Sequence, residues 1–227
     1  MKSKKLVIYG DGRFAEIAYE YFTHDSPYEV AGFAVERAYL RKKELFELPV
    51  VAIEEVTSHF APDGHSVYVA VVFNQLNRLR ERLMRLAERQ GYALASYVSS
   101  KAFVWPNVTL GKHCFIFEHN VVQPFSAIGD NAVLWSGNHI GHHARLGHHV
   151  FISSHVVVSG SCVIGDYCFF GVNSAVADGV TVGADCFVNL AAAVTRNLAG
   201  NHMYRGNPAQ AYREDARAYF KVPHALD

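Results

Sequence analysis

The chain has 227 residues, half of them hydrophobic, which suffices for one large domain or two small ones with a sizeable core. Lys plus Arg and Asp plus Glu number 21 each, so the formal net charge of zero provides no electrostatic footprint for nucleic acid or an anionic membrane. The first apolar run covers only residues 6–9, and no run approaches the roughly 20 residues that span a bilayer. We therefore expect a cytoplasmic protein with no nucleic-acid and no membrane partner.

Strands and helices alternate over the first part of the chain. Short apolar runs with β-branched residues are typical of buried parallel strands, and three are found at residues 6–9, 29–35 and 66–72. Helices are expected after the segment 10–15, through residue 21, and from about 75 to 89, where leucines recur on one face before Gly91. The pattern predicts an α/β domain over residues 1–97, a half-Rossmann βαβ unit.

A glycine turn, Gly10-x-Gly12-x-x-Ala15, follows the first strand and opens the first helix, and Glu36 ends the second strand. A helix N-terminus attracts phosphate, and Arg13 can pair with a phosphate oxygen. The turn is compatible with a dinucleotide, as in an oxidoreductase, or with a packing turn alone. The small size of the domain favours a nucleoside diphosphate.

From Val98 the pattern changes to a strict period of six. Every sixth residue is large and apolar: Val98, Val104, Leu110, Ile116, Val122, Ile128, Leu134, Ile140, Leu146, Ile152, Val158, Ile164, Phe170, Val176, Val182, Val188 and Val194. Fixed periods of this kind mark solenoids. Each hexapeptide is expected to form a short strand and a turn, so that three make one triangular coil with the apolar residues inside. The sequence predicts an all-β left-handed parallel β-helix over residues 98–227.

Cysteines and histidines fall at distinct places in the repeat. Cys114, Cys162, Cys168 and Cys186 occupy the small interior position and are expected to be packing residues. Residues two and three past each apolar corner are expected to face outwards, which places His142, His143, His148, His149 and His155 on the outer surface. A zinc site is the alternative use of these histidines, but no acidic or thiol ligand accompanies them at a recognisable spacing. We expect no metal.

The hexapeptide array, the end motif Tyr204-Arg-Gly-Asn-Pro-Ala209 and the βαβ half-domain carry a resemblance over nearly the whole chain. The chain resembles the left-handed β-helix (hexapeptide-repeat) nucleotide-sugar acetyltransferases, including bacillosamine-pathway and perosamine N-acetyltransferases, and is similar to sialic acid O-acetyltransferases. The resemblance implies acetyl-CoA as co-substrate, a nucleotide-linked amino sugar as acceptor and a homotrimer with active sites at subunit interfaces.

The resemblance also implies roles for residues of the β-helix. The general base of the family aligns with His142, and a histidine suits this task at neutral pH. The family has Glu or Asp at the next position, where this chain has His143, and a histidine that contacts acetyl-CoA where it has Phe151. His139 and His155 are possible substitutes for the lost polar contacts. The pantetheine arm is expected along Val172 and Leu190, eighteen residues apart.

In the first domain, the resemblance implies that Gly12, Arg13 and Phe14 contact the nucleotide-sugar, and that Val35 and Glu36 contact its base or ribose. Two asparagines after the third strand, Asn74 and Asn77, are further candidate contacts.

The predicted function is transfer of an acetyl group to the amino group of a nucleotide-linked amino-deoxy sugar, in the synthesis of a bacterial surface glycan. Two alternatives stay open. A sugar O-acetyltransferase would use the same machinery on a hydroxyl, which needs its base more. A non-enzymatic scaffold would have kept the β-helix and lost the chemistry.

Overall fold

The computed structural model describes residues 2, 4–211 and 215–223. The chain forms two units, and it passes between them three times. The first unit comprises the residues up to Val72 together with Leu79–Ser99, and the second comprises Phe73–Arg78 and the residues from Ser100 onwards. We did not predict from the sequence that Phe73–Arg78 belongs to the second unit.

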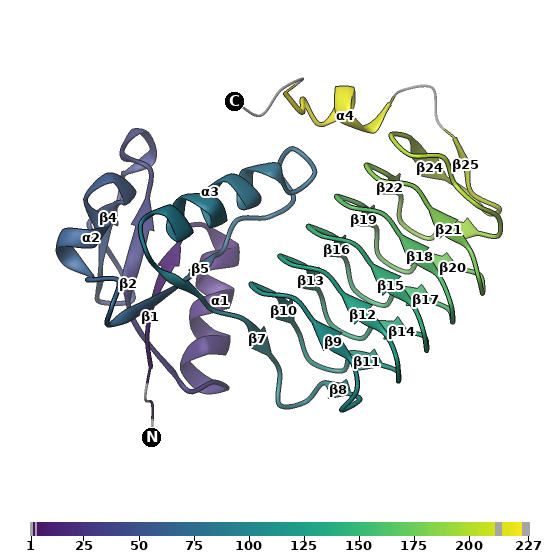
Figure 1. Cartoon of the computed structure of the whole chain (residues 1–227). Helices are drawn as coiled ribbons and strands as arrows, with labels where there is room; N and C mark the ends of the chain where they lie inside the picture. Colours follow the sequence, from purple (N-terminus) through teal and green to yellow (C-terminus); the bar gives the residue numbers. More distant parts are fainter. Residues whose placement is uncertain (1, 3, 212–214, 224–227) are drawn as a thin grey trace. The chain divides into compact units, whose positions relative to one another are not determined.

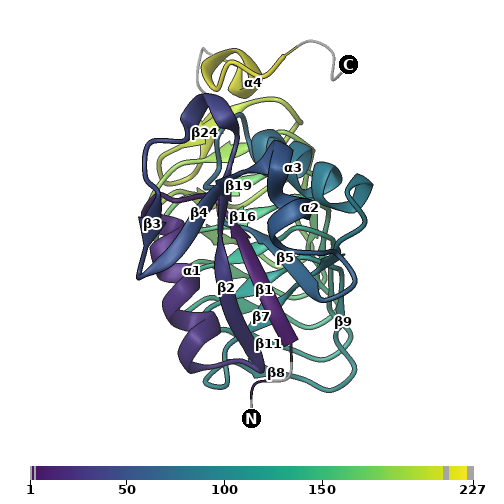
Figure 2. The same ribbon diagram turned by 90° about the vertical axis from the view of Figure 1, so that its left-hand side faces the viewer.

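The first unit is built on a six-stranded sheet in the order β3-β4-β2-β1-β5-β6. The strands are β1 (Lys4–Tyr9), β2 (Tyr28–Val35), β3 (Glu44–Leu45), β4 (Leu48–Ala52), β5 (His65–Val69) and β6 (Ala93–Leu94). Figure 2 shows β1 between β2 and β5, and β1 is parallel to both of these strands. Only the β3–β4 hairpin is antiparallel. The central strand is buried because its apolar run is covered on both faces, as a parallel sheet requires.

The helices of the first unit follow the strands to which the sequence assigned them. They are α1 (Arg13–His24), α2 (Val56–His59) and α3 (Arg78–Arg89), with single 3-10 turns at Arg37–Tyr39 and Ile53–Glu55. The predicted start of α3 at residue 75 is wrong. Gln75, Leu76 and Asn77 have φ angles of 54°, 47° and 67°, so three consecutive residues adopt the left-handed conformation and the helix begins at Arg78.

Packing within the second unit accounts for this left-handed turn. The ring of Phe73 packs against the rings of Phe151 and Phe169, with centroids 5.3 and 4.6 Å away. Arg78 forms an ion pair of 2.7 Å with Asp185 and stacks on the ring of Tyr167. These contacts fix both ends of the turn, and they outweigh the local preference for a right-handed helix.

The second unit is a β-helix of two-residue strands, one per hexapeptide (Figure 1). The strand of the first hexapeptide, β7 (Tyr97–Val98), still belongs to the first unit. The repeating strands of the second unit are β8 (Phe103–Val104), β9 (Thr109–Leu110), β10 (Phe115–Ile116), β11 (Val121–Val122), β12 (Ala127–Ile128), β13 (Val133–Leu134), β14 (His139–Ile140), β15 (Arg145–Leu146), β16 (Phe151–Ile152), β17 (Val157–Val158), β18 (Val163–Ile164), β19 (Phe169–Phe170), β20 (Ala175–Val176), β21 (Thr181–Val182), β22 (Phe187–Val188) and β23 (Ala193–Val194). The strands β24 (Met203–Arg205) and β25 (Gln210–Ala211) and the helix α4 (Ala216–Tyr219) follow.

Strands eighteen residues apart pair in parallel, which builds three sheets from the three sides of each coil. The apolar corner residues from Ile116 to Val194 and all four cysteines lie in one buried core, so the predicted interior packing is confirmed. The first three corners are the exceptions, because Val104 and Leu110 are only partly buried and Val98 is 38% exposed. No helix in the described part of the chain is long and apolar enough to cross a membrane.

The coils approach so closely at some corners that only glycine fits. A Cβ atom on Gly129 would lie 2.5 Å from the carbonyl oxygen of Gly147 and 2.8 Å from the amide nitrogen of His148. We predict that Gly129→Ala destabilises the second unit by about 3 kcal/mol, because the backbone of the next coil has to move. Urea unfolding measures the effect. The matched control is Gly64→Ala, since the nearest atom there is 3.8 Å away. Equal unfolding midpoints for the two variants would contradict the packing described.

Candidate active site

The turn after β14 carries His142 and His143, two and three residues past the corner residue Ile140. The preceding coil fixes its backbone. The amide of His142 donates to Oε1 of Gln123 over 2.9 Å, and the amide of His143 donates to the carbonyl of Pro124 over 3.1 Å. Both side chains are exposed, so two imidazoles stand on a rigid turn in contact with solvent.

The two imidazoles contact each other through the same ring atom. Nδ1 of His142 lies 3.2 Å from Nδ1 of His143. In a pair of neutral imidazoles one Nδ1 has to donate and the other to accept, so the contact selects opposite tautomers. If Nδ1 of His142 carries the proton, its Nε2 is a free lone pair and can act as a base.

An aromatic ring holds His143 from the other side. Phe125 stacks on His143 with centroids 4.8 Å apart and an interplanar angle of 26°. Phe125 is 62% exposed, and its amide donates to Oδ1 of Asn107 over 3.0 Å, which fixes its own turn. His143 therefore has a fixed ring plane, although it brings no fixed negative charge.

Gly160 lies eighteen residues after His142, on the next coil. A Cβ atom on Gly160 would lie 2.6 Å from Cε1 and 2.9 Å from Nε2 of His142, and 2.8 Å from Oδ1 of Asp178 on the coil beyond. Gly160 is buried although it stands at an outer turn, because these two side chains cover it. The absence of a side chain at residue 160 thus lets His142 and Asp178 converge.

The other histidines of the second unit have different surroundings. His139 is half-buried on β14, between Val121 and Val157 of the neighbouring strands. His155 is exposed and lies over Gly137, and Nδ1 of His148 accepts from the amide of Asp130 over 3.0 Å. The structure gives none of these three a contact with His142.

Backbone conformation explains much of the richness in histidine. Five histidines have φ angles of 58–60° in the left-handed region, where His, Asn and Asp are the favoured residues other than glycine: His113, His119, His143, His149 and His155. They occupy the third position past a corner, which His142 does not. The backbone conformation of the β-helix turn favours histidine at these five positions, so the number of histidines is not in itself evidence for a catalytic or metal-binding role.

The structure corrects the prediction that His149 faces outwards. His149 is buried, with Tyr167 stacked on its ring at 4.8 Å and Nδ1 bound to the side chain of Asn131 at 2.9 Å. Asn77 covers it, since Nδ2 donates to the carbonyl of His149 over 2.6 Å. Asn77 is therefore held in the packing of the second unit, and its contact with the substrate stays a prediction. Its neighbour Asn74 is exposed.

Phe151 is buried in the ladder of rings that includes Phe73 and Phe169. This packing explains the apolar residue at position 151, and the contact of Phe151 with the cofactor stays a prediction. Val172 and Leu190 remain suitable for an apolar ligand. They lie eighteen residues apart at outer turns, and they are 44% and 67% exposed.

In the first unit the glycine turn leaves the N-terminus of α1 open. Gly12 is the N-cap residue, no side chain caps the helix, and no atom lies within 4 Å of a Cβ built on Gly12. Arg13 is exposed at the first helical position, whereas Phe14 is buried in the core. Lys42 donates to the carbonyl of Asp11 over 3.0 Å and adds a second cation to this end. The open end of the helix and the two cations suit a phosphate group.

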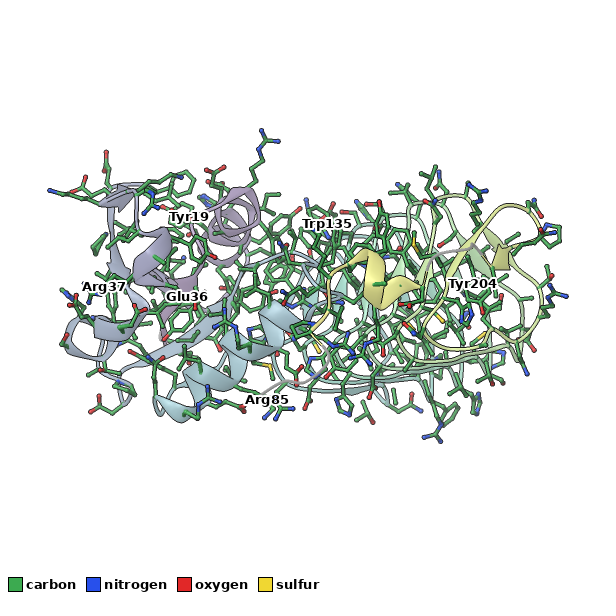
Figure 3. The ribbon with its side chains drawn as sticks, turned by 90° about the horizontal axis from the view of Figure 1, so that it is seen from above. Tyr19, Glu36, Arg37, Arg85, Trp135 and Tyr204 are labelled. Carbon is green, nitrogen blue, oxygen red and sulfur yellow. The ribbon has the colours of Figure 1, made fainter. Side chains whose placement is uncertain are left out.

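Glu36 at the end of β2 is already engaged. Its two carboxylate oxygens each accept from the guanidinium of Arg82 on α3 over 2.9 Å, and Figure 3 labels it among the side chains of the first unit. The carboxylate is held in one orientation, with a quarter of its side chain exposed. The neighbouring Val35 is buried, so only its backbone is available to a ligand. Within the described residues, no three His, Cys, Asp or Glu side chains are grouped to hold a metal ion.

Comparison with known proteins agrees with this geometry. The bacterial transferase hexapeptide repeat matches residues 125–160, the segment that contains the paired histidines. A variant of perosamine N-acetyltransferase from Caulobacter crescentus, in complex with CoA and GDP-perosamine, is 28% identical, with a TM-score of 0.82 over 92% of this chain and 97% of that chain. The chain carries this repeat, and its enzyme class is that of an acyltransferase.

More distant relatives share the fold of this acyltransferase. The acetyltransferase domain of PglB from Neisseria gonorrhoeae is 21% identical with a TM-score of 0.82, and WeeI from Acinetobacter baumannii is 20% identical with a TM-score of 0.75. Each match covers 92% of this chain and all of the other. No curated protein sequence matches the chain. The predicted family resemblance, enzyme class and acyl donor are confirmed by the repeat match and by the perosamine N-acetyltransferase structures of 27–28% identity, which contain CoA.

Residues that surround the paired histidines were not among the predicted site residues. Gln123, Phe125, Gly160 and Asp178 all contact or approach the pair. The spacing of eighteen residues was the available signal for Gly160 and Asp178, because it places them in line with His142. No comparable signal marks Phe125, whose exposed ring resembles any surface aromatic.

The shared proton between the histidines can be measured directly. At pH 8, nitrogen-15 spectra of the imidazoles should show one of His142 and His143 with its proton on Nδ1 and the other with its proton on Nε2. His148 is an internal reference, because Nδ1 accepts a backbone hydrogen bond and its proton has to be on Nε2. Identical tautomers for His142 and His143 would contradict the contact.

Proposed function

We propose that this acyltransferase is an acetyl-CoA:nucleotide-amino-sugar N-acetyltransferase in which His142 is the general base. One observation carries the proposal: an exposed, rigidly held imidazole pair directs a free Nε2 at a gap between coils. Support for the acceptor comes from the 28% identical relative, which binds CoA together with GDP-perosamine.

The reaction needs no covalent enzyme intermediate. The amine nitrogen of the sugar attacks the thioester carbonyl carbon, and Nε2 of His142 takes the proton that the nitrogen sheds. The carbon–sulfur bond then breaks, and the departing thiolate takes the proton from His142. His143 acts as a positioning residue, since its Nδ1 fixes the tautomer of His142.

Each substrate has a candidate position on one unit. The acyl donor lies along the outer turns of Val172 and Leu190, where apolar surface is exposed. His139 and His155 remain candidate contacts for the acceptor and the donor. We further propose that the protein is cytoplasmic and acts as a homotrimer, as inferred from the sequence.

The nucleotide-sugar is assigned to residues 1–97. Its diphosphate lies at the open N-terminus of α1, beside Gly12 and Arg13. Its base or ribose contacts the carboxylate of Glu36 and the backbone of Val35, and Asn74 stays a candidate contact.

A sugar O-acetyltransferase is the second candidate. The same turn could deprotonate a hydroxyl, but a hydroxyl is the weaker nucleophile and depends more on a strong base. His143 offers His142 a neutral partner where a carboxylate would raise its basicity. The imidazole pair therefore favours the amine.

A thiol-release assay tests the proposal. Acetyl-CoA is incubated with UDP-, dTDP- and GDP-linked 3-amino and 4-amino sugars, in wild type, His142→Gln and the control His148→Gln. His148 holds the same turn position one hexapeptide later, so it controls for loss of any exposed histidine. We expect release with one amino sugar, a fall of about 10²–10⁴-fold in kcat for His142→Gln, and near wild-type rates for the control.

The contrary results are also informative. Release that survives in His142→Gln would move the base to another residue. If the wild type released no thiol with any amino sugar, the acceptor assignment would be wrong. Release with the hydroxyl sugars alone would then favour O-acetylation.

A further inference from the structure

Asp178 differs from the other aspartates at outer turns of the β-helix. Asp130 and Asp166 stand at the same position, two residues past a corner, and each caps the coil below: their Oδ1 atoms accept from the amides of Lys112 over 2.9 Å and of His148 over 2.7 Å. In the part of the chain that the structure describes, Asp178 accepts no hydrogen bond. Its carboxylate is exposed and available to a ligand.

The free carboxylate is directed at the gap beside the base. One point above Gly160 lies 2.9 Å from Nε2 of His142 and 2.8 Å from Oδ1 of Asp178. The backbone of Gly160 occupies one side of the gap, and because the side chains of His142 and Asp178 are both exposed, a ligand that enters from solvent can reach both atoms. A single nitrogen placed there can donate one hydrogen to each atom.

We propose that Asp178 is a catalytic residue that binds the acceptor amine beside Nε2 of His142 and makes the enzyme selective for an amine over a hydroxyl. The inference rests on the proposed N-acetyltransferase function and names a residue for it. The acceptor class is a sugar carrying a primary amine that is protonated near neutral pH.

The carboxylate of Asp178 acts on the positive charge of the amine nitrogen of the sugar. An arriving ammonium donates to Asp178 and passes one proton through His142 to solvent. The neutral amine then attacks as described above, and its nitrogen is positively charged again in the tetrahedral intermediate until His142 takes the second proton. Asp178 stabilises the nitrogen at both stages, because charge-assisted hydrogen bonds are stronger than neutral ones. A hydroxyl carries no positive charge at either stage and gains less.

The two ring nitrogens of His142 have surroundings of different charge. The titratable and charged groups that the structure places against it are His143 at Nδ1 and Asp178 on the Nε2 side. Since His143 has no fixed charge, Asp178 is the anion that can stabilise the imidazolium formed during the reaction. The negative charge thus comes from the coil two steps further on, instead of from the adjacent residue.

The test compares Asp178→Asn with Asp166→Asn, which removes a carboxylate from the same turn position elsewhere. Thiol release is measured with the amino sugar that the wild type accepts. Binding is measured for that sugar and for its analogue with a hydroxyl in place of the amine; for GDP-perosamine this analogue is GDP-rhamnose. We expect Asp178→Asn to lower kcat/KM by about 10²-fold and to remove the preference for binding the amine, with unfolding in urea unchanged. Asp166→Asn should keep the activity and lose stability, because it weakens a cap.

Gly160→Ala is a second test of the same gap. The three atoms nearest to the added methyl group belong to the side chains of His142 and Asp178, and the φ of Gly160 is not left-handed. The variant should therefore fold normally while it pushes the base and the carboxylate apart, and kcat should fall more than tenfold. Gly64→Ala is the control for a glycine with open space.

The outcomes separate the inference from the function on which it rests. If the wild type is active, and Asp178→Asn and Gly160→Ala both keep an activity within twofold of it, the role of Asp178 is overturned. The N-acetyltransferase function would still stand. Wild-type silence with every amino sugar would overturn the proposed function, and the inference with it. Loss of activity accompanied by equal weakening of amine and hydroxyl binding would also overturn the inference.

Discussion

Backbone pairing between residues eighteen positions apart is the constraint on which the second unit depends. Each coil exchanges backbone hydrogen bonds with both neighbours: the amide of Val121 donates to the carbonyl of Asn138 in the next coil over 2.8 Å, and the amide of His143 donates to that of Pro124 in the preceding coil over 3.1 Å. Neighbouring coils satisfy each other's open edge, so stability comes from stacking and not from a large globular core. The same constraint requires glycine at Gly129, where two backbones meet.

This register also determines what the outer turns can do. Side chains that are distant in sequence stand in vertical lines, and any three adjacent members of a line are separated by fixed coil spacings. The line of His142, Gly160 and Asp178 carries a base, a gap and a carboxylate in that order. A protein with flexible loops would have to order these groups at an entropic cost, whereas the β-helix holds them before a ligand arrives.

The sequence predicted the periodic part of the structure well, because the repeat itself imposes the register. The corner residues and the buried cysteines follow directly from a count of six. Local exceptions were not predictable in this way. His149 and Asn77 are buried because a segment from outside the repeat, Phe73–Arg78, packs against the coils, and nothing in the hexapeptides signals that contact. The left-handed turn that starts this contact likewise contradicts its own helical pattern.

The candidate site was predictable in outline and not in detail. His142 and His143 were found because a family resemblance marked them, and the unusual residue at 143 posed the question of what supplies the negative charge. The structure points to Asp178. Its side chain and that of His142 cover Gly160, and for this reason Gly160 is buried although it lies at an outer turn. The spacing of eighteen residues contains the information, but only the structure shows that Asp178 leaves its carboxylate unused by the backbone.

A crystal structure of the protein with CoA and the accepted amino sugar tests the central claim most directly. The account predicts that the amine nitrogen lies about 3 Å from Nε2 of His142 and from a carboxylate oxygen of Asp178, with the sulfur of CoA beside it. A sulfur atom bound at another turn, such as that of His148 or His155, with the amine out of reach of His142, would contradict it.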